Sequence, residues 1–427
     1  MRRRRPRIGL LGVLLAIGMA AAACKPPSSG GGESSSSTIK IGLLRPVTGT
    51  VAASGKDMEE GWNLYWDQNG KTVAGKKIET FAEDSAGNPS IGLNKATQLT
   101  ASKGVDMIVG PLLANVGLAV ADATNRKGIP LILPIVSADD LTQRKRLDYV
   151  VRVAGWTSSQ TNHPLGEYAA GQGDKTAVTI CTDYAFGYES CGGFTNTFTD
   201  KGGKILRQLW NPIGTQDFST YMAQIKQANP DVVFAEQVGA DSVRFVKAWS
   251  EFGLKDRIKL LGNETLVDQS VLRNMGDVAL GIVSAGHFAD GRAEQETRKF
   301  VEDFRARYSK LPSYYAADMY TAARAIAEAI KSTGGNLSDR KAFVQALKNV
   351  KLESTPMGPE RVDQYGNPVF NVYIRKVEKG PNGLWNVPVK TYEQVSQFWH
   401  YQPDDFLSHP VYSKSYQGNG VWPQPRS

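Results

Sequence analysis

The sequence has few of the residues that build metal centres and hydrolase active sites. Only four histidines occur, and they lie far apart from one another and show no metal-ligand spacing with the three cysteines. This spacing argues against a structural or catalytic zinc site. The G-x-S-x-G motif of α/β hydrolases is also missing, and GYESCGG comes nearest with the wrong spacing. We therefore predict that the chain is not an enzyme and needs no cofactor.

The sequence also lacks a hydrophobic run long enough to cross a membrane. The run at 8–23 contains 16 residues and follows the basic start MRRRRPR. A helix that spans a bilayer needs roughly 20 apolar residues. A basic start, a short apolar run and small residues at its end are typical of an export signal, so we predict a signal peptide over residues 1–23.

Cys24 follows the alanines at the end of that run and precedes the tract KPPSSGGGESSSST. This arrangement resembles the lipobox of bacterial lipoproteins, whose cysteine receives a diacylglyceryl group, although Ala21 stands where leucine is usual. The Ser/Gly tract indicates a flexible tether, so residues 24–37 are predicted to be a lipidated linker. We expect an exported protein held by Cys24 on the extracytoplasmic face of the cell membrane. A soluble secreted protein cut nearby is the alternative.

A strong positive charge is also missing once the signal is removed. The formal net charge is +8, but residues 2–5 and Arg7 supply five positive charges, which leaves 8 − 5, or +3, for a product that begins at Cys24. This balance is too mild to favour nucleic acid as a partner.

Two cysteines, Cys181 and Cys191, remain in the mature chain. In an exported protein they can form a disulfide that closes a short loop. Free cysteines are commonly buried, so two unpaired thiols are the alternative. The predicted compartment favours the disulfide.

Short apolar runs alternate with helical patterns from residue 38 onward, over a length of about 390 residues that is typical of two domains or lobes. Strands are predicted at 39–44, 76–84, 107–110, 130–136, 176–182, 204–210, 232–238, 259–263 and 281–286. Helices are predicted at 56–69, 91–102, 115–127, 160–172, 187–201, 217–228, 239–252, 267–274, 294–310, 314–334 and 338–349. This alternation predicts an α/β fold with parallel sheets and helices on both faces of each sheet.

The last part of the chain departs from this alternation. Residues 356–380 predict a hairpin with its turn at 363–367. Residues 381–427 are rich in aromatics and proline, with too many aromatic residues for a disordered tail. We predict that they form a strap across the surface of a lobe.

The predicted sheets also indicate where a ligand binds. Ligands of open parallel sheets bind beyond the carboxyl ends of the strands. The loops at those ends are 45–56, 84–90, 111–116, 134–140, 182–189, 237–241 and 263–268. A functional site is expected to draw its residues from this set.

The glycine-rich turn GTVAASGKD, at 49–57, lies where a nucleotide phosphate would bind. A Walker loop needs four residues between Gly and Gly-Lys, followed by Ser or Thr. Here five residues separate Gly49 from Gly55, and Asp57 replaces the hydroxyl that binds magnesium. ATP is therefore not expected. We interpret Thr48, Ser54 and Gly55 as residues at the edge of a ligand cleft or as caps of the helix that follows.

The segments IKIGLLRPVTGTVAASGKDMEEG, KKIETFAEDSAGNPSIGLNKATQL and VDMIVGPLLANVGLAVADATNRKGIPLILP follow one another in this order. Together they resemble bacterial solute-binding proteins of branched-chain amino acid ABC importers. The pieces SQTNHPLGEYAA, DYAFGYE and VSQFWHYQPDDFLSHPVYS resemble a branch of that family associated with aromatic acids. The resemblance implies the two-lobed type I periplasmic binding fold, in which each lobe is a parallel sheet flanked by helices and the ligand cleft lies between the lobes.

The same resemblance implies the lobe boundaries. Residues 38–154 and 287–355 are expected to form the N-terminal lobe, and residues 155–286 and 356–380 the C-terminal lobe. The strap then follows at 381–427.

In the N-terminal lobe the resemblance places the site at 110–116 and 134–138. Ala114 stands where amino-acid-binding members have a hydroxyl that binds the ligand carboxylate. Without it, carboxylate binding is expected to pass to Asn115, to Ser137 beside Val136, or to backbone N–H groups at the start of the helix. Asn115 acting only as a helix N-cap is the alternative.

In the C-terminal lobe the matching positions are Tyr184, Phe186, Gln237 and Glu264. Phe186 is expected to stack over the ligand, and Tyr184 offers a ring face or a hydroxyl. Glu264 matches the acid that binds a ligand ammonium, and its alternative is an acid near a helix N-terminus. Trp156, near the crossing between the lobes, is expected to line the cleft or to pack beside it.

The function implied by this resemblance is a solute-binding lipoprotein of an ABC uptake system. It would capture a branched-chain or aromatic amino acid and deliver it to the permease subunits, working as a monomer. A small aromatic carboxylate, or an amide or urea, is the alternative ligand, and a sensory receptor is the alternative role. Glu264 favours an amine, whereas Ala114 and the branch-like motifs favour an aromatic acid.

Overall fold

The computed structural model describes residues 37–418. The predicted signal peptide, Cys24 and all but the last residue of the predicted linker lie outside this range. The described residues belong to one compact unit, which contains two sheets with their helices. Within the described range, none of the helices has the length and apolar character needed to cross a membrane.

The first sheet has six strands, and we call it and the helices packed on it the first lobe. The strands lie in the order β2 (Thr72–Val73), β3 (Lys76–Asp84), β1 (Thr38–Arg45), β4 (Met107–Val109), β5 (Leu131–Leu133) and β6 (Val150–Arg152). All neighbours are parallel except β2 and β3. The helices of this lobe are α1 (Ala52–Asn69), α2 (Pro89–Gln98) with the π-helical turn η1 (Leu99–Lys103), α3 (Ala114–Arg126), α10 (Tyr314–Ser332) and α11 (Arg340–Lys348).

The second sheet has nine strands and defines the second lobe. Eight strands lie in the order β12 (Lys351–Leu352), β13 (Glu360–Val362), β14 (Pro368–Gly380), β11 (Val283–Gly286), β10 (Lys259–Gly262), β9 (Val232–Ala235), β7 (Thr176–Thr182) and β8 (Lys204–Asn211), and β15 (Gly383–Val395) pairs with β14. The other helices are α4 (Asn162–Gly171), α5 (Ala185–Asp200), α6 (Ser219–Ala228), α7 (Ala240–Glu251), α8 (Gln269–Leu272), α9 (Gln295–Tyr308) and α12 (Pro403–Ser408). Short 3-10 turns are η2 (Asp139–Leu141), η3 (Glu264–Val267) and η4 (Gly276–Ala279).

Local sequence explains why these elements form. The strand VVFA of β9 is buried along its whole length, as expected for a parallel strand covered on both faces. Helix α10 is rich in alanine, and the side chain of Ser313 caps it by accepting a hydrogen bond from Ala316 N. Helices α1 and α10 pack closely at Gly61, where an added Cβ would lie 2.1 Å from Ala316 O.

The predicted α/β alternation is confirmed. The predicted strands 76–84 and 176–182 have the same bounds as β3 and β7, and the hairpin turn lies at 363–367, where Asp363 N donates to Asn367 O over 2.7 Å. The short strand β6 was not predicted, because three residues carry too little periodicity. The strap predicted over 381–427 is wrong in its first part. Residues 383–395 form β15, which pairs with β14.

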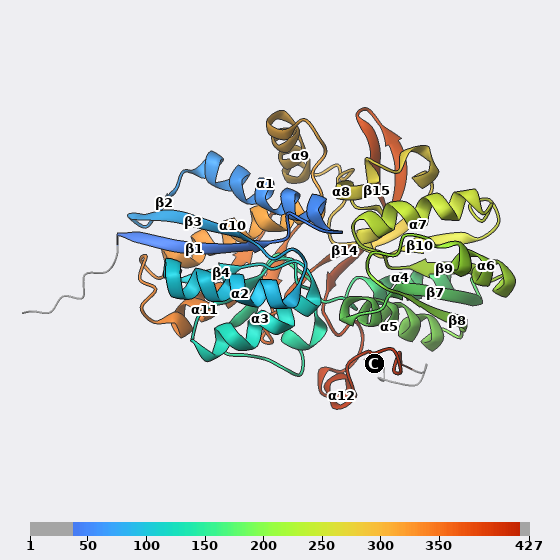
Figure 1. The fold of residues 1–427 in the computed structure, drawn as a ribbon, viewed down its shortest axis with the longest axis horizontal. Coiled ribbons are helices and arrows are strands. Elements are labelled where there is room, and N and C mark those ends of the chain that lie inside the picture. The colour runs from blue at the N-terminus through green and yellow to red at the C-terminus, as the bar shows by residue number, and fades with distance from the viewer. Residues whose placement is uncertain (1–36, 419–427) are drawn as a thin grey trace, which may run out of the picture. The chain divides into compact units, whose positions relative to one another are not determined.

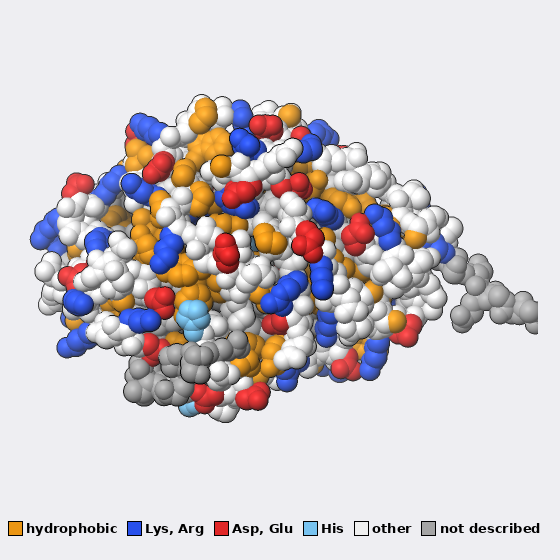
Figure 2. Space-filling model, turned by 180° about the vertical axis from the view of Figure 1, so that it is seen from behind, with side chains coloured by type: hydrophobic (Ala, Val, Ile, Leu, Met, Phe, Trp, Pro, Cys, Tyr) orange, Lys and Arg blue, Asp and Glu red, His pale blue; other side chains and the backbone are white. Residues whose placement is uncertain are grey.

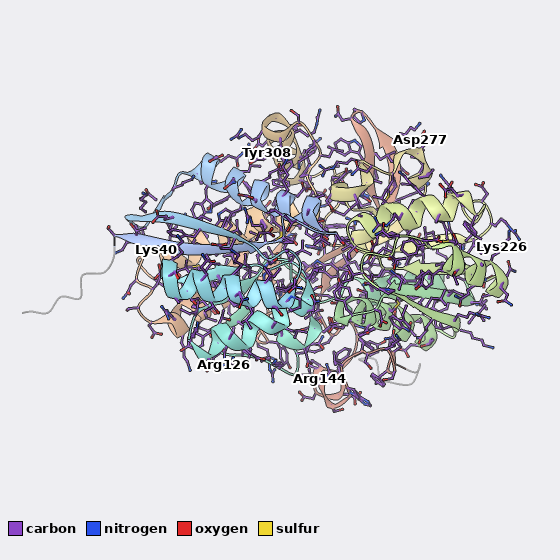
Figure 3. All side chains as sticks on the ribbon, in the orientation of Figure 1. Lys40, Arg126, Arg144, Lys226, Asp277 and Tyr308 are labelled. Carbon is purple, nitrogen blue, oxygen red and sulfur yellow. A yellow bond between two sulfur atoms is a disulfide. The ribbon has the colours of Figure 1, made fainter. Side chains whose placement is uncertain are left out.

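The remaining described residues, 396–418, run over both lobes, and we call them the C-terminal segment (Figure 1). Arg144 of the first lobe donates through Nε to His409 O over 2.7 Å and through Nη2 to Phe406 O over 2.8 Å. On the second lobe, His163 Nε2 lies 3.2 Å from the hydroxyl of Tyr412. Figure 3 shows Arg144 beside α12. The segment therefore links the two lobes.

The buried hydrophobic residues of the two lobes meet in one cluster, which includes Trp156, Phe186 and Tyr314. A second cluster lies within the second lobe. On the surface, basic and acidic side chains are intermixed across the described part of the face that Figure 2 shows.

Candidate functional site

The two lobes contact each other where the strands of both sheets end. The loop before α1 brings Thr50 O within 3.2 Å of Ala240 N, at the start of α7. In the first turn of α1, Ser54 Oγ lies 3.1 Å from Ser270 Oγ. Beyond it, Arg273 Nη2 donates to Asp57 Oδ2 over 2.9 Å. These contacts hold the carboxyl ends of the two sheets against each other.

A group of buried rings lies between the lobes, and we call it the aromatic cluster. Its members are Trp156, Tyr184, Phe186, His287, Tyr314 and Tyr315. The ring centroid of Trp156 lies 5.6 Å from that of Phe186, 6.0 Å from that of His287 and 6.2 Å from that of Tyr314. Trp156 thus touches rings that come from both lobes and from the chain crossing between them.

Each ring of the cluster is positioned by the end of a strand or the start of a helix. Trp156 follows β6 at the first crossing between the lobes, and His287 follows β11 at the second. Tyr184 is the N-cap residue of α5, and Phe186 lies in its first turn. The start of α5 approaches β7 closely at Gly187, where an added Cβ would lie 1.9 Å from Thr182 O. Glycine is therefore needed to bring these two rings to the interface.

A disulfide between Cys181 and Cys191 joins the end of β7 to α5. It closes a loop with a sequence separation of 10 residues. Tyr184 and Phe186 both lie within this loop, so the bond fixes the segment that carries two of the rings.

Trp156 carries an unpaired polar atom. Its side chain is 1% exposed, and its indole Nε1 has no hydrogen-bonding partner among the described residues. A buried donor without a partner costs about 1–3 kcal/mol. Such a donor at the centre of a ring cluster is suited to an anionic ligand group.

A chain of four buried ionisable side chains runs behind the cluster. His287 Nε2 lies 2.7 Å from Asp318 Oδ1 in α10, and His287 Nδ1 lies 2.6 Å from Glu264 Oε2 in η3. Arg375 of β14 donates through Nη1 to Glu264 Oε1 over 3.1 Å. Acids alternate with bases along this chain, in the order Asp318, His287, Glu264 and Arg375.

The pKa values of this chain follow from burial and from the neighbouring charges. Burial lowers the pKa of His287, but Asp318 and Glu264 outweigh it and raise that pKa to about 10. Burial raises the pKa of Glu264, but His287 and Arg375 outweigh it and bring that pKa below its ordinary value. His287 is therefore an imidazolium at neutral pH, and Glu264 is a carboxylate.

Both oxygens of Glu264 are occupied by protein donors. Oε2 accepts from the backbone N–H of His287 over 3.1 Å as well as from its ring, and Oε1 accepts from Phe288 N over 3.1 Å as well as from Arg375. Two cations already balance this carboxylate. An ammonium ion would have to displace one of these partners to bind Glu264.

Of the other second-lobe residues predicted for the site, Gln237 is fully buried and pairs with Asn211. Its Nε2 donates to Asn211 Oδ1 over 2.8 Å, and its Oε1 accepts from Asn211 Nδ2 over 3.0 Å. This reciprocal amide pair uses both ends of the Gln237 side chain.

The predicted residues of the first lobe line its strand ends. Ser137 O accepts from Ser158 N over 2.8 Å, and its hydroxyl lies 3.2 Å from the hydroxyl of Ser158. Val136 is buried beside it. Helix α3 begins at Ala114 after the N-cap residue Leu113, so the alternative in which Asn115 is the N-cap is wrong. The Oδ1 of Asn115 accepts from Val116 N over 2.9 Å.

The structure also excludes one of the two roles predicted for Thr48 and Ser54, which is the capping of α1. The helix begins at Ala52 after the N-cap residue Val51, so neither Thr48 nor Ser54 caps it. Thr48 Oγ1 instead donates to Asp84 Oδ2 over 2.7 Å. Ser54 is fully buried at the contact between the lobes.

Sequence reasoning missed His287, Tyr314, Tyr315 and Arg375. His287 follows directly after β11, and the rule that ligands bind beyond strand ends would have selected it if the loop after 281–286 had been included. Tyr314 and Tyr315 start α10, where their ring centroids lie 3.9 Å apart. Arg375 gives no such signal, because it lies inside a long strand that runs antiparallel to its neighbour β11.

Within residues 37–418, no group of three or more His, Cys, Asp or Glu side chains is arranged to hold a metal ion.

A model of the periplasmic binding protein family matches residues 38–382 of this chain. Among individual proteins, the Leu/Ile/Val-binding protein homolog 6 of Brucella melitensis is 29% identical over 363 residues, which cover 83% of this chain and 92% of that protein.

Two solved structures are also similar. A solute-binding protein of an ABC transporter from Rhodopseudomonas palustris BisB5, in complex with 3,4-dihydroxybenzoic acid, is 32% identical with a TM-score of 0.81, covering 84% of this chain and 99% of that chain. A solute-binding protein of an ABC transporter from R. palustris, in complex with benzoate, is 27% identical with a TM-score of 0.79, covering 84% of this chain and 97% of that chain.

Proposed function

Because the chain belongs to the periplasmic binding protein family, we propose that it captures a small aromatic carboxylate between its lobes and delivers it to an ABC permease. The fold is the two-lobed type I periplasmic binding fold. Proteins of this family and fold are extracytoplasmic substrate-binding components of ABC transporters rather than enzymes. The proposal concerns the ligand and its delivery.

The observation that carries the proposal is the state of Glu264. Its two oxygens accept four hydrogen bonds from within the protein, and His287 and Arg375 balance its charge. A zwitterionic amino acid needs a free anion for its ammonium group, because a buried unpaired charge is costly. An aromatic carboxylate needs no such anion.

The rings and donors of the site suit an aromatic carboxylate. The aromatic cluster offers ring edges and faces for an apolar ring, which aromatic pairs use at centroid distances of about 4.5–7 Å. The unpaired Nε1–H of Trp156 and the first-turn N–H groups of α5, a helix without a side-chain cap, favour an anion. The similar R. palustris proteins that were solved with benzoate and with 3,4-dihydroxybenzoic acid support the same ligand class.

An amino acid is the second candidate, since the relative from B. melitensis is named as a Leu/Ile/Val-binding homologue. For this ligand, Glu264 would have to exchange one of its internal partners for the ammonium group. Amides and urea use neither the rings nor the anion-binding donors.

Calorimetric titration of the purified protein tests the proposal. We expect micromolar or tighter binding of benzoate, 4-hydroxybenzoate or 3,4-dihydroxybenzoate, and a raised melting temperature, because a ligand at 1,000 times its Kd adds about 4 kcal/mol of stability. Leucine, isoleucine, valine and phenylalanine should give no shift. Binding of the amino acids alone would overturn the aromatic-acid proposal.

We also propose that the exported chain is anchored through lipid on Cys24 and works as a monomer. The basic start, the apolar run and the Ser/Gly tract of the sequence support the anchor. Metabolic labelling with a fatty acid should mark the wild-type protein and not a Cys24→Ser variant. Deletion of the gene should abolish uptake of the ligand, whereas a sensory role would leave uptake intact.

A further inference from the structure

Two buried polar side chains stand side by side at the ends of β9 and β10. These strands are parallel, with Ala235 paired with Gly262, so the next residues, Glu236 and Asn263, occupy matching positions. Asn263 N donates to Ala235 O over 3.1 Å and continues the pairing by one residue. Both side chains are 0% exposed. Side chains at paired positions of parallel strands lie on the same face of the sheet.

Each of these side chains is held at one end and free at the other. Glu236 Oε2 accepts from Thr182 N over 2.7 Å, and Asn263 Oδ1 accepts from Thr265 Oγ1 over 2.9 Å. Glu236 Oε1 and Asn263 Nδ2 have no hydrogen-bonding partner among the described residues. An acceptor and a donor are thus left unpaired in neighbouring positions.

This pair lies beside the aromatic cluster. Phe234, two residues before Glu236 on the same face, stacks on Phe194 of α5 at a centroid distance of 4.6 Å. The same helix begins next to Tyr184. Burial raises the pKa of Tyr184 well above its ordinary value, and electrostatic interactions with Glu236 and Tyr315 add to the rise. Thr182 gives the geometric link: its N–H donates to Glu236 Oε2, and its backbone O accepts from Tyr184 N over 2.8 Å.

The hydrogen-bonding roles of Glu236 Oε1 and Asn263 Nδ2 determine which ligand group can bind both atoms. A single small group must donate to the Glu236 oxygen and accept from the Asn263 amide, and a hydroxyl does both. Leaving both buried atoms unpaired is unfavourable. Burial raises the pKa of Glu236 to about 7, although the hydrogen bonds from Thr182 oppose the shift, so the side chain is not a strong cation site at neutral pH.

We propose that Glu236 and Asn263 bind a ring hydroxyl of the ligand, so that the protein selects hydroxylated aromatic acids over benzoate. This inference rests on the proposed function and narrows its ligand class. A site built to bond a hydroxyl discriminates against the analogue that lacks it, because its own polar groups are then left unpaired. The carboxylate end of the ligand would meet Trp156 Nε1 and the start of α5, and its hydroxyl end would meet Glu236 and Asn263.

The test compares the Kd values of benzoate, 3-hydroxybenzoate, 4-hydroxybenzoate and 3,4-dihydroxybenzoate by calorimetry, first on the wild-type protein. We expect at least one hydroxylated acid to bind about 10- to 100-fold more tightly than benzoate. Glu236→Gln presents a second donor in place of the acceptor, and Asn263→Ala removes the donor. Each should reduce this preference to about threefold or less, mainly by weakening the binding of the hydroxylated acids.

Glu360→Gln is the matched control. Glu360 is a buried carboxyl whose pKa burial also raises to about 7, and its Oε1 accepts from Ala154 N over 2.8 Å. It should keep the wild-type preference.

Equal binding of all four acids by the wild type, or equal weakening of all four in Glu236→Gln, would overturn the inference and assign the two atoms to a bound water. Binding of no aromatic acid at all would overturn the proposed function and the inference with it. The comparison of the four Kd values on the wild-type protein tests the inference even if a variant fails to fold.

Discussion

His287 Nδ1 lies 2.6 Å from Glu264 Oε2, and both side chains are almost completely buried. The two residues belong to the ends of different strands, and Asp318 of α10 completes the link from the second lobe to the first. A buried ion pair of this kind tolerates the loss of one partner poorly, because the other charge remains in a medium of low dielectric constant. Glu264 is thus built into the framework of the site.

We predict that Glu264→Gln lowers the free energy of unfolding by about 3–5 kcal/mol. The amide cannot balance His287 and Arg375, and its NH₂ group faces donors where the carboxylate accepted hydrogen bonds. Urea unfolding measures the change. Glu251→Gln, an exposed change of the same type in α7, should stay within about 0.5 kcal/mol of the wild type. A Glu264→Gln variant that melts like the wild type but loses amino-acid binding would show that Glu264 is a ligand residue.

We predict that the pH dependence of the free energy of unfolding reflects the titration of His287. Asp318 and Glu264 outweigh burial and raise the folded-state pKa to about 10, from 6.5 as the ordinary value. The folded state therefore holds this proton more tightly than the unfolded state. The resulting stabilisation is complete below pH 6.5 and is lost as the pH rises toward 10.

Between pH 7 and 9 we expect the free energy of unfolding of the wild type to fall by up to about 1.4 kcal/mol per pH unit. His287→Gln should start from a lower stability and show a flatter profile over this interval. Urea unfolding at several pH values measures both profiles. Two parallel profiles would contradict the assignment of the slope to His287.

The sequence was sufficient to predict those elements whose bounds depend on residues close together in the chain. The bounds of β3 and β7 could be predicted because apolar runs end at turn residues, and the hairpin at 363–367 because Asp, Gly and Asn mark its turn. The partners of Glu264 could not be predicted in this way. His287 lies 23 residues and Arg375 lies 111 residues further along the chain, and only the assembled second sheet brings them together.

Another contact between the lobes brings two acidic residues, Glu189 and Asp139, close together. Glu189 Oε2 of α5 accepts from Asp139 N over 3.1 Å and from Ser158 Oγ over 2.7 Å. Burial, followed by the charge of Asp139, raises the pKa of Glu189 well above its ordinary value. The folded protein therefore takes up a proton here that the unfolded chain releases, and wild-type stability falls as the pH rises above 4.5, the ordinary pKa of this group.

We predict that Glu189→Gln is more stable than the wild type at pH 8, by about 1 kcal/mol. Glutamine keeps an oxygen that accepts both hydrogen bonds and removes the charge beside Asp139, which still balances the buried Arg152. The advantage should shrink as the pH falls, because the wild-type side chain then becomes neutral too. Thermal unfolding from pH 5 to 8 measures this trend, and a variant less stable than the wild type at every pH would contradict it.

The C-terminal segment gives a prediction about closure of the lobes. Arg144 donates to three of its backbone carbonyls, and its guanidinium carbon lies 5.5 Å from the centroid of the Phe406 ring. On either side of these carbonyls, Tyr401 and Tyr412 reach Asp200 and His163 of the second lobe. The match to the family model ends at residue 382, so this link lies outside the part of the chain that the family model matches.

We expect Arg144→Ala to cost about 2 kcal/mol, since hydrogen bonds to a charged group contribute about 1.5–3 kcal/mol and the side chain is largely buried. The released segment should become sensitive to limited proteolysis after residue 396. Because the segment touches both lobes, its release also removes contacts that favour the closed arrangement, so ligand affinity should fall together with stability. Arg146→Ala, which removes an exposed arginine over the ring of Tyr365, should leave proteolysis and affinity unchanged. If Arg144→Ala frees the segment while the Kd stays the same, the segment stabilises the lobes without favouring their closed arrangement.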